Sequence, residues 1–235
     1  MEKDKPLALL ISGLDGTGKL YYRQIDPLSK YYRVLPWEFF RRDAFDLKDL
    51  VEELVGSTAD EKDGSMLVVG ESFGGLIALQ FALDYPGKIK NLALINTFPF
   101  YRRRVRIALA CRWARLLQKP FIRNIKDWAA AWILATEGIP PEDRRRYLDV
   151  IRTIHHPAYC RRLQLVRDSD LRDRLHELRV PVHLFASGRD KIVPSIAAAR
   201  LMKSAISGAT LHEFPHAGHA LLLTPGFNLA DYFTG

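Results

Sequence analysis

The sequence contains only two cysteines and no long apolar run. Cys111 and Cys160 are not spaced as metal ligands are, so we expect reduced thiols in a cytoplasmic protein, with a single disulfide as the alternative. No window approaches the roughly 18 apolar residues that a membrane span requires. The N-terminus has mixed charge and no small-residue cleavage site, which does not indicate a secretory signal. With 235 residues, 48% of them apolar and 26% charged, the chain is predicted to form one globular domain with an insertion.

Positive charge is concentrated in one segment. Between Tyr101 and Glu177 there are 18 Lys or Arg residues against 9 Asp or Glu, a net charge of +9, whereas the whole chain carries +8. Nine basic residues occur from Arg102 to Lys126 before the first acid, Asp127. Such an excess predicts an anionic partner, unless the arginines only solvate helix surfaces. We do not expect nucleic-acid binding, because no recognised motif for it accompanies the arginines.

Short apolar runs alternate with helical patterns toward both ends of the chain. Asp46–Val55 has apolar residues at helical spacing, and Gly74–Tyr85 is an apolar helical pattern that ends before Pro86. Strands alternating with helices are typical of βαβ units and a parallel sheet. The apolar runs predict strands at Leu7–Ser12, Tyr31–Pro36, Met66–Gly70, Leu92–Asn96, Val182–Ala186 and Thr210–Phe214.

Strand patterns are absent between Phe98 and Leu178. Arginine-rich helical patterns replace them, with tryptophans and with prolines as breaks. Arg112 interrupts the apolar stripe of its helix, so insertion into a membrane surface is not favoured. We therefore predict an α/β core formed by residues 1–98 and 178–235, and a helical insertion at residues 99–177.

The loop after the first predicted strand allows two interpretations. Its Gly13-xxxx-Gly18-Lys19 spacing resembles a P-loop, as at the start of a thymidylate kinase, in which backbone N–H groups bind phosphates. A P-loop requires Ser or Thr after the lysine as a ligand of Mg²⁺, and this chain has Leu20 there. The alternative is a glycine-rich loop that shapes a different site.

A second motif, Gly70-Glu71-Ser72-Phe73-Gly74, lies between a predicted strand and a predicted helix. A G-x-S-x-G sequence in that position resembles the nucleophile elbow of the α/β-hydrolase superfamily. In that elbow the serine occupies a strained turn, and the glycines allow backbones to approach closely. Ser72 is the nucleophile that the resemblance implies, and the alternative is a glycine-rich turn with an inert serine.

A serine nucleophile needs an adjacent base, and the base needs a carboxylate that fixes its tautomer. The family supplies them in the order Ser, Asp, His. Ser187-Gly-Arg-Asp190 resembles the family's acid loop, although Asp190 taken alone would be a turn or helix-cap residue. Gly218-His219 resembles its histidine loop, which implies His219 as the base, with His216 as a competitor three residues earlier.

The resemblance also gives the loop after the first strand a role. In the family this loop commonly reads His-Gly-x, and the N–H of x forms the oxyanion hole together with the N–H after the nucleophile. Here the loop reads Ser12-Gly13-Leu14, which implies the backbone N–H groups of Leu14 and Phe73 and leaves Lys19 without a phosphate to bind. The departure is Ser12, which replaces the usual histidine and puts the supporting hydrogen bonds of the loop in question.

The resemblance implies an α/β-hydrolase fold, a mostly parallel sheet flanked by helices, with residues 99–177 as a helical cap. The implied activity is that of a serine carboxylesterase acting on a small-molecule acyl ester, with no cofactor and no metal. The layout is similar to that of pimeloyl-carrier-protein methyl ester esterases, so an acidic carrier protein or another anionic substrate is expected at the basic cap. Thioesterase and acyltransferase are alternatives of the same fold, and a hydrolase-fold binding protein without catalysis is an alternative of another class.

Overall fold

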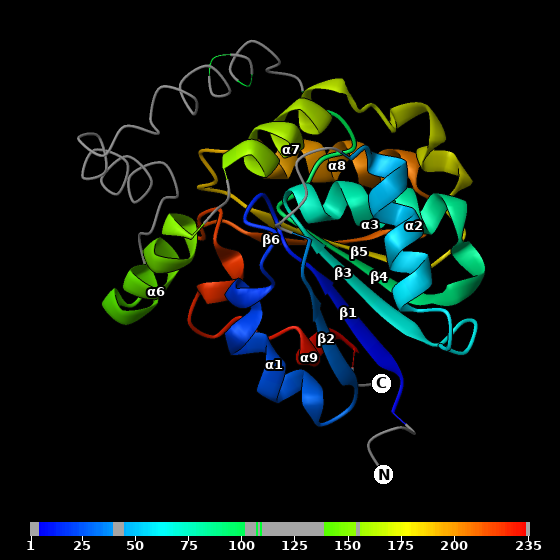
Figure 1. Ribbon diagram of the computed structural model, residues 1–235, viewed down its shortest axis with the longest axis horizontal. Helices are drawn as coiled ribbons and strands as arrows, with labels where there is room; N and C mark the ends of the chain where they lie inside the picture. The colour runs from blue at the N-terminus through cyan, green and yellow to red at the C-terminus, as the bar shows by residue number, and fades with distance from the viewer. Residues whose placement is uncertain are drawn as a thin grey trace.

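The centre of the protein is a six-stranded sheet with the order β2-β1-β3-β4-β5-β6 (Figure 1). The computed structural model describes residues 5–39, 45–101, 107, 109, 139–153 and 156–233. All neighbouring strands of this sheet pair in parallel. Each predicted strand is present, with ends shifted by at most three residues. The strands are β1 Leu7–Ile11, β2 Arg33–Trp37, β3 Met66–Glu71, β4 Ile89–Ile95, β5 Val182–Ser187 and β6 Thr210–Phe214.

Helices cover both faces of the sheet (Figure 1). The side chains of β1 alternate between the faces: Leu7 and Leu9 pack into the core under α2, α3 and α8, whereas Ala8 and Leu10 pack against α1 and the last segment of the chain. The α-helices are α1 Tyr22–Ser29, α2 Leu47–Ser57, α3 Phe73–Asp84, α6 Pro141–Arg152, α7 His156–Asp168, α8 Ser195–Ala205 and α9 Ala230–Phe233. Short 3₁₀ helices are η1 Lys19–Tyr21, η2 Pro86–Lys88, η4 Arg172–Glu177 and η5 Leu221–Leu223.

The two predicted core helices form for reasons visible in their sequences. Asp46 caps α2: its side chain accepts the N–H of Asp49 at 2.9 Å, and the Asp49 side chain accepts the N–H of Asp46 at 2.7 Å. By contrast, α3 is buried along nearly its whole length, which explains why it is apolar on every side. Phe73, the first residue of α3, is fully buried as well.

The inserted segment is described only in part. Except for Ile107 and Leu109, its arginine-rich stretch from Arg102 to Lys126 lies outside the described residues, as do its tryptophans. Cys111 lies outside them too, so a disulfide to the buried Cys160 stays untested. The two ends of the segment meet, because Phe100 forms an antiparallel bridge with Asp170. A separate cap at residues 99–177 remains a prediction. Within the described helices, none has the length and apolarity to cross a bilayer.

Gln24 connects α1 to the segment that follows the predicted base. The side chain is fully buried. Its Nε2 donates to the carbonyl oxygens of Leu222 at 3.0 Å and Phe227 at 3.2 Å, and its Oε1 accepts the N–H of Leu229 at 2.9 Å. One amide therefore satisfies three backbone groups that water cannot reach.

We expect Gln24→Ala to lower the free energy of unfolding by about 2–4 kcal/mol, because it leaves three buried backbone groups without a partner. Urea unfolding followed by circular dichroism measures the change. Gln80→Ala on α3 is the control, since the Gln80 amide donates an exposed hydrogen bond to Asp84 Oδ2 at 2.6 Å. This substitution should lower the free energy of unfolding by less than about 0.5 kcal/mol. Equal midpoints for the two variants would contradict the role of Gln24.

Candidate active site

Ser72 occupies a sharp turn between β3 and α3. Its φ is 53° and its ψ is −118°, a region that residues with a side chain rarely adopt. The turn is held from β4: the Ser72 N–H donates to the carbonyl of Ile95 at 2.9 Å, and the Thr97 hydroxyl donates to the Ser72 carbonyl at 2.6 Å. The strain at Ser72 is thus supported by the neighbouring strand.

The glycines of the motif are required by the close approach of backbones. A Cβ atom at Gly74 would lie 2.1 Å from the carbonyl oxygen of Ile11, and one at Gly70 would lie 2.6 Å from the carbonyl oxygen of Gly74. Neither position has room for a methyl group. The same contact brings the end of β1 against the turn that carries Ser72.

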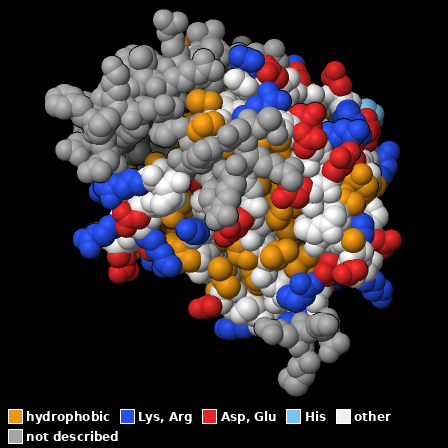
Figure 2. Space-filling view, viewed as in Figure 1, with side chains coloured by type: hydrophobic (Ala, Val, Ile, Leu, Met, Phe, Trp, Pro, Cys, Tyr) orange, Lys and Arg blue, Asp and Glu red, His pale blue; other side chains and the backbone are white. Residues whose placement is uncertain are grey.

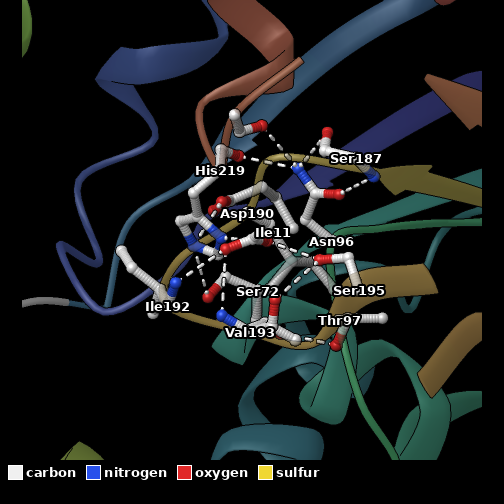
Figure 3. Close-up of polar contacts among 12 residues, drawn as sticks. Ile11, Ser72, Asn96, Thr97, Ser187, Asp190, Ile192, Val193, Ser195 and His219 are labelled. Carbon is white, nitrogen blue, oxygen red and sulfur yellow. Dashed lines mark hydrogen bonds and ion pairs between the residues drawn. The ribbon is translucent and has the colours of Figure 1, made fainter. Parts of the chain in front are cut away.

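The structure brings the three predicted catalytic side chains together (Figure 3). His219 Nε2 lies 3.1 Å from Ser72 Oγ, and His219 Nδ1 lies 2.7 Å from Asp190 Oδ2. The three residues follow β3, β5 and β6 at one edge of the sheet, where open α/β sheets bind ligands. The competitor His216 is exposed, whereas His219 is buried.

Asp190 is fixed by donors from the turn after β5. Its Oδ1 accepts the N–H groups of Ile192 and Val193, each at 2.9 Å, and its Oδ2 accepts a bond from the Ser195 hydroxyl. Burial of Asp190 would raise the pKa of this carboxyl, but the charge and hydrogen bond of His219, with the bonds from Ser195 and Val193, lower it overall. Asp190 is therefore an ionised, oriented acceptor for the imidazole.

Asn96 positions the histidine loop, and the sequence analysis did not identify it. Its Nδ2 donates to the carbonyl of His219 at 2.8 Å and to Ser187 Oγ at 3.0 Å. Its Oδ1 accepts the N–H of Ser187 at 2.9 Å. One buried amide at the end of β4 thus joins β5 to the loop of the candidate base. Its only local signal was its position at the end of a predicted strand.

The loop after β1 does not have the structure of a phosphate-binding loop. Four successive N–H groups already have acceptors within the protein, and one of these acceptors is a carboxylate, which would repel phosphate. Ser12 Oγ is another of them, so this serine supports the loop where the family has histidine. The bonds run from Gly16 to the Gly13 carbonyl, Thr17 to Asp15 Oδ2, Gly18 to Ser12 Oγ and Lys19 to Thr17 Oγ1.

The predicted oxyanion donors lie beside the candidate nucleophile. Phe73 is the first residue of α3, so its N–H has no partner within the helix. A Cβ atom at Gly13 would lie 3.3 Å from Ser72 Cβ, which places the Gly13–Leu14 peptide next to the serine. The assignment of the Leu14 and Phe73 N–H groups to an oxyanion hole stays a prediction that this placement supports.

A second carboxylate, that of Glu71, also faces His219. Glu71 Oε1 lies 3.5 Å from His219 Nε2, and its side chain is only 13% exposed. Burial and the charges of Asp15 and Asp190 raise the pKa of Glu71 to about 7, against the opposing effects of His219 and the Gly13 N–H. Glu71 is the variable residue of the G-x-S-x-G motif, and the sequence analysis gave it no role.

His219 is therefore an imidazole between two carboxyl groups. Burial would lower the pKa of His219, but the charge and hydrogen bond of Asp190 and the charge of Glu71 outweigh it and raise the pKa to about 9. The site thus stabilises the protonated imidazole.

The described part of the chain offers no metal site of the usual kind. None of its groups of three or more His, Cys, Asp or Glu side chains could bind a metal ion.

Comparison with known proteins identifies the family. The family model described as "Serine aminopeptidase, S33" (Hydrolase_4) matches residues 36–225. The chain belongs to this α/β-hydrolase family, which confirms the resemblance. A curated relative from Serratia proteamaculans (strain 568), named "Putative carbamate hydrolase RutD", is 25% identical over 94% of this chain and 88% of its own. A RutD relative from Klebsiella pneumoniae is 26% identical over 93% of this chain and 86% of its own.

Solved structures share the fold. The esterase EaEST from Exiguobacterium antarcticum superposes with a TM-score of 0.81 at 17% identity, over 93% of this chain and 86% of that one. The enol-lactonase from Burkholderia xenovorans LB400 superposes with a TM-score of 0.74 at 20% identity, over 92% and 85% of the two chains. These similarities confirm the predicted fold class.

We expect Glu71→Gln to lower the pKa of His219, because it removes one of the two negative charges that favour the imidazolium ion. NMR titration of the histidine side chains measures the pKa directly and requires no substrate. The control is Glu213→Gln, which removes an equal charge from an exposed residue that pairs with Arg200. An unchanged or higher pKa of His219 in Glu71→Gln would show that the Glu71 carboxylate does not act on the imidazole.

Proposed function

We propose that the protein is a serine hydrolase that cleaves carboxylic esters through an acyl-enzyme. The observation that supports this most is the unbroken series of hydrogen bonds from Asp190 through His219 to Ser72, at a strained turn at the edge of the sheet. This arrangement lets a base remove the proton of a serine hydroxyl while a carboxylate fixes the tautomer of that base.

In the proposed reaction, which requires the neutral imidazole, Ser72 Oγ attacks the ester carbonyl and His219 Nε2 takes the hydroxyl proton. The N–H groups of Leu14 and Phe73 bind the oxyanion that forms. His219 then gives the proton to the leaving alcohol, and water attacks the acyl-enzyme with the same imidazole as base. Asp190 and Glu71 stabilise the imidazolium ion that exists at each transition state.

The same residues serve other acyl substrates. A thioesterase or an acyltransferase would use the same relay, and the RutD relatives carry a carbamate in their printed name. A panel of ester, thioester and carbamate substrates with a common acyl group therefore separates these activities. The alternative of a catalytically inactive binding protein is disfavoured. The 3.1 Å contact between His219 and Ser72 is the geometry by which a base activates a serine nucleophile, and ligand binding alone does not require it.

We expect Ser72→Ala to lose hydrolysis of short-chain nitrophenyl esters by on the order of 10⁴-fold or more, since the nucleophile is removed. The native protein should also be labelled by a fluorophosphonate probe, and Ser72→Ala should not. Ser204→Ala is the control, because this exposed serine on α8 donates to the Leu201 carbonyl of its own helix and to no other group among the described residues. Folded Ser72→Ala protein that still turns over the ester would refute the mechanism.

We further propose that the basic segment steers an anionic substrate or an acidic carrier protein to the site. In its described part, Arg144, Arg145 and Arg146 are exposed on α6, and Lys and Arg side chains gather there in Figure 2. Attraction between exposed charges raises association rates and is screened by salt over about 10 Å at 0.1 M.

We expect kcat/KM for an ester carried on an acidic acyl carrier protein to fall steeply between 50 and 500 mM salt, as estimated from the screening length. The rate for a neutral small ester should change little, because no charge attraction contributes to its binding. Arg145→Gln should reduce the salt dependence for the carrier substrate only. Equal salt responses for both substrates would reject steering.

A further inference from the structure

Arg162 on α7 is fully buried, yet its guanidinium has no hydrogen-bond acceptor among the described residues. The side chain is 0% exposed, and Nε, Nη1 and Nη2 are all buried without a partner. A guanidinium carries five N–H donors, and proteins bury such a charge only against an acceptor or an opposite charge. Its position therefore calls for an anion that the described protein does not supply.

Other arginines of the same region do have acceptors. Arg161 donates to the carbonyl of Phe45, and Arg167 forms a two-bond ion pair with Asp168 at 2.7 and 2.9 Å. Both of these side chains are partly exposed, so water also reaches them. Arg162 differs in both respects, which separates it from the arginines that only solvate a helix surface.

The guanidinium of Arg162 lies on the same side of the protein as the candidate nucleophile. Its central carbon is 5.7 Å from the centre of the Phe39 ring, and that ring is 6.1 Å from the ring of Phe73, the residue after Ser72. The Asp15 carboxylate in the loop after β1 also acts on its charge. Two aromatic rings thus connect the cation to the turn that carries the nucleophile.

The charge balance favours one class of anion. Burial lowers the pKa of Arg162 to about 10, with an opposing effect of Asp15, so the side chain stays cationic at neutral pH. The Asp15 carboxylate, which acts on the charge of Arg162, would repel a dianionic phosphate more strongly than a singly charged anion. A carboxylate carries a single charge, and its two oxygens match the guanidinium fork.

We propose that Arg162 binds a carboxylate of the substrate, so that the substrate is an ester that also bears a free carboxylate, such as a monoester of a dicarboxylic acid. The proposal rests on the proposed function only for the ester bond at Ser72. Binding of the carboxylate requires no catalysis. The other interpretation is that Arg162 only balances the charge of Asp15 from a distance.

Binding is tested on Ser72→Ala protein by calorimetry. The probes are N-methyl monoamides of dicarboxylic acids, with chain lengths from four to eight carbons, and the corresponding neutral N,N′-dimethyl diamides. We expect at least one monoamide to bind more tightly than its diamide, and the added substitution Arg162→Met to weaken that binding about 10- to 100-fold, the range for a hydrogen-bonded charged group. Arg167→Met, which removes an equal charge from the same helix, should leave it unchanged.

Kinetics give a second measurement. Arg162→Met should reduce kcat/KM for the dicarboxylic monoester about 10- to 100-fold and leave the neutral diester within about two-fold. Arg162→Lys should lie between the two, because it keeps the charge but loses the planar fork, and it provides the test if Arg162→Met does not fold. The preference for the monoester should persist at high salt, since buried pairs are little screened.

The outcomes separate the two proposals. The carboxylate site would be overturned if Arg162→Met reduced kcat/KM equally for the monoester and the diester. It would also be overturned if no monoamide bound more tightly than its diamide. Neither result would contradict the esterase proposal. Monoamide binding that depends on Arg162 in a protein that cleaves none of the esters would support the site and refute the esterase proposal.

Discussion

The strained turn at Ser72 is the constraint on which the rest of the site depends. A positive φ at a residue with a side chain persists only where the surroundings allow no alternative. Here Ile95 at the end of β4 and Thr97 just after it hold the turn, while the end of β1 contacts it at Gly74. The parallel sheet therefore fixes the serine from both sides, and the loops that carry the other site residues are built on this fixed point.

Electrostatics then determine the state of His219. A buried imidazole would ordinarily be neutral, but Asp190 binds one of its nitrogens and Glu71 approaches the other. Because both carboxylates favour the proton on the ring, the imidazole is a stronger base with a stable imidazolium ion, and a smaller fraction of it is neutral at neutral pH. Asn96 adds rigidity by holding the loop backbone at His219 itself. The imidazole is thus held in position, and its protonated form is stabilised.

The sequence predicted what depends on local pattern. The six strands and the elbow at Ser72 follow from apolar runs and a short motif, whereas Glu71, Asn96 and Arg162 depend on which segments meet in space. The starts of two strands differed from prediction by more than one residue. Polar Lys90 and Asn91 hid the start of β4, although Ile89 already pairs with Met66. Tyr31 was placed in β2, but its N–H extends the end of α1 by bonding to the Leu28 carbonyl at 2.9 Å.

The bridge between Phe100 and Asp170 brings the chain back to the core near the point where it left. Such a closure means that the intervening segment can vary in length and composition during evolution without moving any strand of the sheet. With the proposed roles of Arg162 and Ser72, selectivity and chemistry would then be inherited separately, because Arg162 lies in that segment and Ser72 does not. A related enzyme could acquire a new acyl preference by replacing the segment between Phe100 and Asp170 alone, while the residues at the edge of the sheet stay unchanged.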